Sequence, residues 1–108
     1  ERMVRYADIF AALGAEPRLR IVRLLLSAHP DGMVVNEIQS ELQITGSTLS
    51  HHLDKLRNEG LLTVARESTC LRYRANAEVL QELLAFLFAE CCRKSGCVPA
   101  DQVVRMCK

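Results

Sequence analysis

The sequence predicts a mainly α fold that carries one β-hairpin, and three observations predict it. Apolar residues recur at steps of three and four in several segments, which is the spacing of amphipathic helices. Two neighbouring runs, 61–66 and 70–74, are instead rich in β-forming residues and are separated by a short polar stretch, as in a hairpin. Finally, 108 residues with 49% hydrophobic content can bury one modest core, so we expect a single domain over residues 1–108.

The first part of the chain predicts two helices and a turn. An apolar stripe predicts a helix from Met3 to Leu13, which Gly14 can end. The stripe comprises Val4, Ile9, Phe10 and Leu13. After Pro17, a second helix through Ser27 carries too many large aliphatic residues for a surface helix, so we expect it at the centre of the core. Residues 29–32 have the composition of a turn.

The next two segments predict a helix-turn-helix. Apolar residues of Val34–Leu42 lie at helical spacing, and only a few residues separate this segment from a second helix within Ile44–Gly60. In the second helix, Leu49, Leu53 and Leu56 fall on one stripe, and Gly60 supplies a stop. Two short helices joined by a tight turn form a helix-turn-helix.

The face opposite the leucine stripe is polar and suits a DNA major groove. Small hydroxyls and an imidazole, as at Ser47 and His51, can bond base edges, while Lys55 and Arg57 lie further along toward phosphates. His52 flanks the apolar stripe, so a packing or phosphate-contacting role is as open for it as a role in reading bases. An ordinary solvated helix face is the alternative interpretation of this pattern.

The hairpin that follows is predicted to be a wing, with arginines flanking its tip. The predicted architecture is therefore a winged helix-turn-helix. The formal net charge of +1 supports nucleic-acid binding only weakly, but cations outnumber anions from Ser47 to Arg74. A dimer would double this local basic patch. We expect the DNA contacts to come from Ser47, Thr48, Ser50, His51, His52, Lys55, Arg57, Arg66 and Arg72.

A last helix over about residues 76–95 is predicted to form a dimer interface. Asn76 can cap it, and its apolar residues cover most of its circumference. A helix of this kind must be buried on two sides, whereas one small domain offers one side. The second side is predicted to be another subunit, through Leu80, Leu83, Leu84 and Leu87.

These segments together resemble the ArsR/SmtB family of bacterial metal-responsive repressors. The resemblance covers roughly residues 5–90 and rests on Ala12–Ile21, Ser47–Arg57, Gly60–Leu62, Arg66–Glu67 and Tyr73–Arg74. It implies a homodimeric repressor that binds double-stranded operator DNA, with terminal helices that pair across a two-fold axis. Each of these is an expectation for this chain.

Cysteines gather at the end of the last predicted helix. The chain has five cysteines and no signal-peptide core or long apolar run, so we expect a cytoplasmic protein with reduced thiols and no membrane segment. Gly96 can turn the chain back, which would bring Cys97 toward Cys91 and Cys92. Three thiolates without histidine suit trivalent arsenic, or antimony, better than zinc.

Other uses of these cysteines stay open. Zinc, cadmium or lead would need a fourth donor, which Cys107, Glu90 or Asp101 could supply. The cysteines could also be incidental, or sense oxidants through a Cys92–Cys97 disulfide. A thiol reductase would lack the Cys-x-x-Cys on a βαβ scaffold, so we expect no enzyme. The roles of Cys70 and Cys107 and the conformation of residues 98–108 are left open.

The resemblance bears on the inducer as well. Many arsenic sensors of the family hold a Cys-x-Cys motif at the position of residues 33–37, which contain no cysteine in this chain. The zinc sensors of the family use Asp and His ligands along the last helix, whereas this chain has no histidine after His52. A minority of arsenic-responsive relatives place a Cys-Cys pair and a further Cys at the end of the last helix. Cys91, Cys92 and Cys97 resemble that arrangement, which implies an arsenic inducer, inorganic as arsenite or organic, since organoarsenicals can use fewer thiols.

Overall fold

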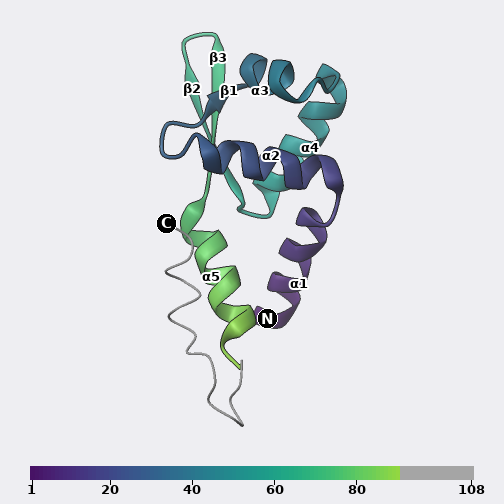
Figure 1. The fold of residues 1–108 in the computed structure, drawn as a ribbon, viewed down its shortest axis with the longest axis vertical. Helices are drawn as coiled ribbons and strands as arrows, with labels where there is room; N and C mark the ends of the chain where they lie inside the picture. Colours follow the sequence, from purple (N-terminus) through teal and green to yellow (C-terminus); the bar gives the residue numbers. More distant parts are fainter. Residues whose placement is uncertain (91–108) are drawn as a thin grey trace. The chain divides into compact units, whose positions relative to one another are not determined.

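The computed structural model describes residues 1–90 of the chain (Figure 1). Its elements are α1 (Arg2–Leu13), α2 (Glu16–Ser27), β1 (Met33–Val34), α3 (Val35–Leu42), α4 (Gly46–Asn58), β2 (Leu62–Glu67), β3 (Cys70–Ala75) and α5 (Ala77–Phe88). One compact unit comprises Glu1–Asn76, and a second begins at Ala77 with α5. This order confirms the predicted fold class of helices with a β-hairpin, while the single domain over residues 1–108 stays a prediction.

Helix α2 is the central element of the first unit, as its composition predicts. It contacts α1, α3, α4 and β3, and it buries Ile21, Val22 and Leu25. Not all of its aliphatic residues are used in this way, since Leu19 is 46% exposed and Leu26 is 39% exposed. The helix is therefore amphipathic.

Helix α1 buries less of its predicted stripe than expected. Ile9 and Ala12 are buried, whereas Val4 is 57% exposed and Phe10 is 38% exposed. The N-terminal end of α1, to which Val4 belongs, projects away from α2 (Figure 1). The periodicity of apolar residues identifies the apolar side of a helix. It does not indicate how many turns of that side pack against another element of the unit.

The sheet has one strand more than the sequence predicts. Its order is β1-β3-β2, all antiparallel, and Met33 and Val34 of β1 pair with Tyr73 and Arg72 of β3. The predicted helix from Val34 consequently begins one residue later. A strand of two residues is too short to show the alternation by which strands are detected.

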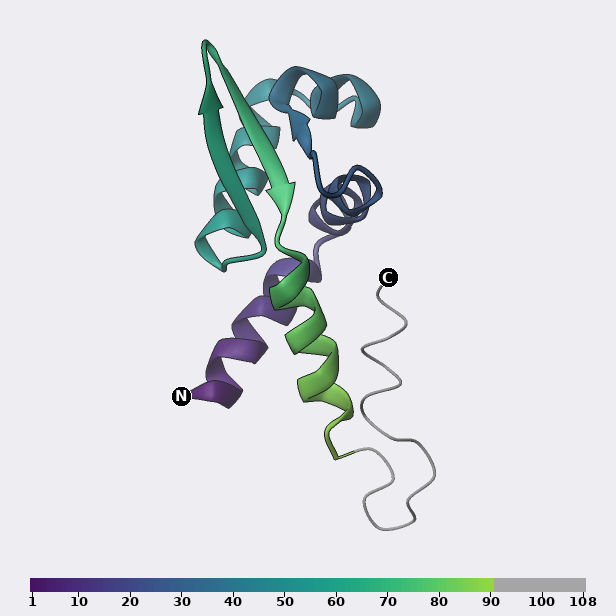
Figure 2. The ribbon, with the colours of Figure 1, turned by 90° about the vertical axis from the view of Figure 1, so that its left-hand side faces the viewer.

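Strands β2 and β3 and the turn between them form a two-stranded wing (Figure 2). The register of the pairing sorts its side chains onto two faces. Glu67 pairs with Cys70, so Ser68 and Thr69 alone form the turn, and Ser68 adopts a φ of 59°. One face carries the apolar set Leu62, Val64, Leu71, Tyr73 and Ala75. The other face carries Thr63, Ala65, Glu67, Cys70, Arg72 and Arg74.

Helix α5 is shorter than predicted. It ends at Phe88, and Ala89 and Glu90 form a turn, in which the Ala89 N–H donates to the Phe86 carbonyl at 3.3 Å. A bond from residue i to i−3 tightens the last turn of a helix, so the expected continuation through Glu90 is wrong. Residues 91–95 of the predicted helix lie outside the described residues. No helix within residues 1–90 combines the length and apolar character that a membrane span requires.

Candidate nucleic-acid interface

Local chemistry fixes the turn between α3 and α4. Gln43 adopts the left-handed conformation with a φ of 54°, and its N–H donates to the Gln39 carbonyl at 2.8 Å. Thr45 is the N-cap of the next helix; its carbonyl accepts the Leu49 N–H at 2.8 Å, and its hydroxyl donates to the Thr48 hydroxyl at 2.9 Å. A left-handed residue ends one helix and an extended residue starts the other, so the two helices change direction within three residues.

Buried leucines hold α4 so that its polar side faces outward. Leu49, Leu53 and Leu56 are at most 1% exposed, which confirms the predicted stripe. Six of the residues predicted to contact DNA are exposed on this helix: Ser47, Thr48, Ser50, His51, Lys55 and Arg57. Arg57 also forms a 3.7 Å ion pair with Asp54 one turn away.

His52 is placed differently from these six residues. It is half-buried, and its Nδ1 lies 3.3 Å from an Arg18 guanidinium nitrogen. Burial lowers the pKa of His52 below 6.5, and the positive charge of Arg18 and the neighbouring His51 lower it further. A neutral imidazole that faces Arg18 corresponds to the packing role rather than the phosphate role.

Arg18 is a positioning residue that the sequence did not reveal. Its Nε donates to the Ala12 carbonyl at 2.7 Å, and its terminal nitrogen meets His52, so one guanidinium joins α1, α2 and α4. The partners lie 6 and 34 residues away in the chain. No local spacing rule connects residues so far apart, and no signal in the sequence marked this contact.

The arginines of the wing lie on opposite faces of the hairpin. Arg66 follows the register of Leu62 and Val64 and lies beside the turn; it is exposed, and within residues 1–90 its side chain makes no hydrogen bond or ion pair. Arg72 lies on the other face and is less available than expected, since its side chain is 27% exposed and bonded to protein. The wing therefore offers Arg66 to a ligand more readily than Arg72.

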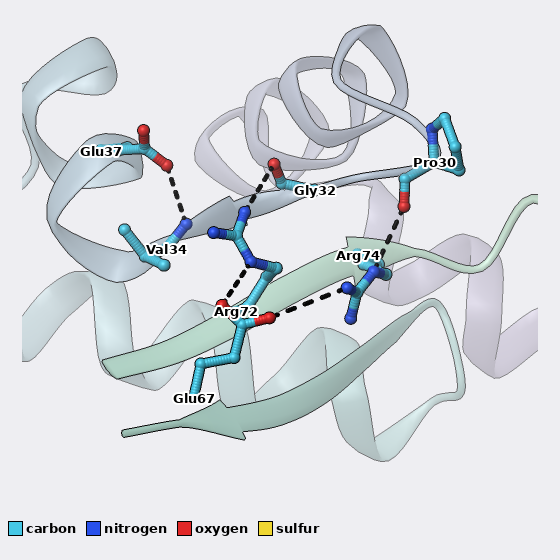
Figure 3. A network of polar contacts seen from close by, with 7 residues as sticks. All are labelled: Pro30, Gly32, Val34, Glu37, Glu67, Arg72 and Arg74. Atoms are coloured by element: carbon cyan, nitrogen blue, oxygen red, sulfur yellow. Dashed lines mark hydrogen bonds and ion pairs between the residues drawn. The ribbon is translucent and has the colours of Figure 1, made fainter. Parts of the chain in front are cut away.

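A polar network occupies the outer face of the wing (Figure 3). The Arg72 Nε donates to Glu67 at 2.9 Å, and a terminal nitrogen of Arg72 lies 3.4 Å from the Gly32 carbonyl. The Arg74 Nε donates to the Pro30 carbonyl at 3.2 Å, and its guanidinium lies 3.9 Å from Glu67. The hydrogen bond to Glu67 is the main cause that raises the pKa of Arg72. The strand period of two could have indicated that Glu67, Arg72 and Arg74 share a face.

The predicted metal ligands Cys91, Cys92 and Cys97 lie outside the described residues, as does Cys107. Within residues 1–90, no group of three His, Cys, Asp or Glu side chains is placed to hold a metal ion. Cys70 is exposed on β3 as a free thiol. The described part of the chain thus presents a nucleic-acid interface, and the proposed sensor site stays a prediction.

Of the leucines predicted at a dimer interface, Leu87 is exposed, Leu80 and Leu84 are half-buried, and Leu83 is buried.

Comparison with known proteins agrees with this geometry. A family model described as a helix-turn-helix domain matches residues 13–65, which include α2, α3 and α4. An HTH-type transcriptional regulator of Methanocaldococcus jannaschii is 33% identical over 84 residues, which cover 78% of this chain and 92% of that protein. The chain belongs to the helix-turn-helix family of transcriptional regulators. It is a DNA-binding regulator and not an enzyme.

Solved structures place this regulator among winged helix-turn-helix proteins. The transcriptional activator HlyU of Vibrio cholerae is 28% identical over 85 residues, which cover 79% of this chain and 76% of HlyU. A solved HlyU structure matches with a TM-score of 0.67 over 85% of this chain and 97% of the chain in that structure. A structure of reduced HlyU matches with a TM-score of 0.65 over 84% of this chain and 93% of that one. A homodimeric winged helix-turn-helix DNA-binding domain from Mycobacterium bovis, a possible ArsR-family regulator, is 25% identical with a TM-score of 0.65 over 90% of both chains.

Proposed function

We propose that this regulator is a homodimeric repressor of the ArsR type that leaves its operator when a trivalent arsenic species binds Cys91, Cys92 and Cys97. The observation that carries the DNA-reading part is the exposed polar face of α4, held outward by three fully buried leucines. The sensing part is supported by the cysteine pattern of the sequence and by the resemblance to arsenic-responsive repressors.

The roles on DNA follow from position along α4. Ser47, Thr48, Ser50 and His51 lie in its first half, where short donors and acceptors can meet base edges in a major groove. Lys55 and Arg57 lie in its last turn and meet phosphates. Arg66 of the wing adds a contact to the flanking backbone. His52 contributes indirectly, by packing against Arg18.

A homodimer gives this weakly charged chain enough contacts. One copy offers few cations to phosphates, whereas two copies on a palindromic site double the electrostatic contribution and place two helices about 34 Å apart. The homodimeric relative from Mycobacterium bovis supports this assembly. Exposed apolar side chains at Met3, Val4 and Leu87 supply surface that a partner subunit could cover.

The inducer acts by changing the geometry of the dimer. A ligand releases DNA only through its different affinities for two conformations, and couplings of about 1–3 kcal/mol change operator affinity roughly 5- to 150-fold. The first of these cysteines lies three residues after the end of α5, the helix that we assign to the dimer interface. An ion that draws Cys91, Cys92 and Cys97 together would alter how the subunits sit against each other. The separation of the two α4 helices would then no longer match the half-sites.

Operator binding by reduced protein, titrated with arsenite, zinc or peroxide, tests this function. Cys91→Ser, Cys92→Ser and Cys97→Ser should each keep operator binding and lose release by arsenite. Cys70→Ser is the matched control and should respond as the parent does. Cys107→Ser should also respond normally if three sulfurs suffice, whereas its loss of response would indicate a four-ligand metal site. Normal arsenite release by all three cluster variants would refute the sensor assignment.

Thiol oxidation is the second candidate signal, favoured by the similarity to HlyU, for which a reduced form is described. In this case peroxide should release the operator and a dithiol reductant should restore binding, while arsenite alone should have no effect on reduced protein. Cys92→Ser and Cys97→Ser should then lose the peroxide response together, because a disulfide needs both partners.

A further inference from the structure

The outer face of the wing carries a carboxylate between two arginines. Glu67 bonds the Arg72 Nε at 2.9 Å through one oxygen and lies 3.9 Å from Arg74 through the other (Figure 3). Its two oxygens are thus divided between the two guanidinium groups. Glu67 neutralises part of the positive charge that this face would otherwise present.

Both arginines are also bonded to the main chain beyond the wing. Arg72 meets the Gly32 carbonyl at 3.4 Å, and Arg74 donates to the Pro30 carbonyl at 3.2 Å. An isolated exposed ion pair contributes little to stability. Here, however, each guanidinium has a carboxylate and a carbonyl as partners, so its charge is partly compensated and two of its three nitrogens already have a partner in the protein.

Arg66 is held by no such network. It lies on the opposite face, one residue from Glu67, and its side chain is exposed without a polar partner in the described part of the chain. The wing therefore contains three arginines, of which the one nearest its tip, Arg66, is ready for DNA. The register decides which one, because adjacent strand residues point to opposite faces.

The number of available cations sets how strongly a regulator binds DNA of any sequence. Sequence-independent affinity grows with each phosphate that is neutralised, and specificity is the ratio of operator binding to this background. We propose that Glu67 is a specificity-determining residue, which withholds Arg72 and Arg74 from DNA and so lowers binding to non-operator sequences. This inference uses only the DNA-binding function and is independent of the inducer.

Glu67→Gln in the full chain is the direct test, with affinities for operator and random duplexes measured across salt concentrations. The released arginines should raise affinity for random DNA about fivefold each near 0.15 M salt, and steepen the salt dependence by about 0.9 per new phosphate contact. Operator affinity should rise less than random affinity, so specificity falls. Thermal unfolding of the variant establishes that it is folded.

Glu41→Gln is the matched control, because it removes one carboxylate charge from exposed α3 without breaking an ion pair within residues 1–90. In the Glu41→Gln variant, DNA affinity should change only by the effect of removing one negative charge from the protein. In an Arg72→Gln, Arg74→Gln background, Glu67→Gln should likewise produce no more than the Glu41→Gln effect. Equal salt slopes for Glu67→Gln and Glu41→Gln in the otherwise native chain would overturn the proposal.

A second measurement does not depend on the folding of the Glu67 variant. With Glu67 present, the double variant Arg72→Gln, Arg74→Gln should keep the parent's salt slope, because neither arginine contacts phosphate in the parent. A slope lower by about 0.9 or 1.8 would show that one or both arginines already bind DNA, and the withholding role of Glu67 would be refuted.

Discussion

Gly32 is the residue where the smallest substitution should have the largest structural effect. It precedes β1 with a φ of +73°, and a Cβ added there would overlap the Tyr73 carbonyl oxygen and lie 2.7 Å from the Arg74 Cγ. These neighbours belong to β3, the central strand of the sheet. Gly32→Ala should therefore separate β1 from β3 and disturb the base of the wing.

The cost follows from two physical contributions. A left-handed conformation in a residue with a side chain costs about 1–3 kcal/mol. Displacing the packed main chain of Tyr73 adds about 1–3 kcal/mol, as overpacking does elsewhere. The free energy of unfolding should fall by about 2–6 kcal/mol, a large part of the roughly 5–15 kcal/mol available to a domain. At roughly 4–8 °C for each kcal/mol, the melting temperature should fall by about 10 °C or more.

Gly46→Ala is the matched control, because the same methyl group there meets only the Gln39 Nε2 at 3.7 Å and no left-handed backbone is involved. At a helical position, alanine should be neutral or stabilising by up to about 1 kcal/mol. Urea unfolding followed by circular dichroism measures both variants. If Gly32→Ala unfolds within 1 kcal/mol of Gly46→Ala, the close approach of β1 to β3 is not as described.

DNA recognition, acid stability and assembly supply the remaining predictions. His51→Ala should reduce the preference for operator over random DNA by about 1–3 kcal/mol, and an unchanged preference in competition binding would contradict base reading by His51. Arg66→Ala should weaken binding to operator and random DNA by the same factor and lower the salt slope by about 1 in the same assay. The pKa of His52 is lowered in the folded protein, so below pH 6.5 the imidazole is protonated more fully in the unfolded chain than in the folded one. The free energy of unfolding should therefore fall as the pH drops below 6.5. His52→Gln should remove that part of the pH profile in urea unfolding, and an unaltered profile would assign the loss to other groups. Leu87→Asp should yield monomers in sedimentation, and an intact dimer would place the interface elsewhere.

The helices of the first unit could be predicted well because each contains its own signal. In α4, three leucines at steps of four and three mark the buried side, and the structure buries all three. The outward residues follow from the same geometry, since a helix with one side buried must expose the other. The predicted stripe of α1 succeeded less well, since Val4 and Phe10 stay exposed while Ile9 is buried.

What the sequence by itself determined is therefore what neighbouring residues determine: the helices, the two turns, the hairpin and the polar face of α4. Tertiary structure decided what residues distant in the chain do to one another. It added β1 to the sheet through a pairing across 40 residues, joined Arg18 to His52, and divided the wing's arginines between an exposed Arg66 and an Arg72 bonded to Glu67 and Gly32. Local periodicity indicates which side of a helix or strand is apolar. The contacts between distant residues depend on how the elements pack against one another, which no local sequence pattern specifies.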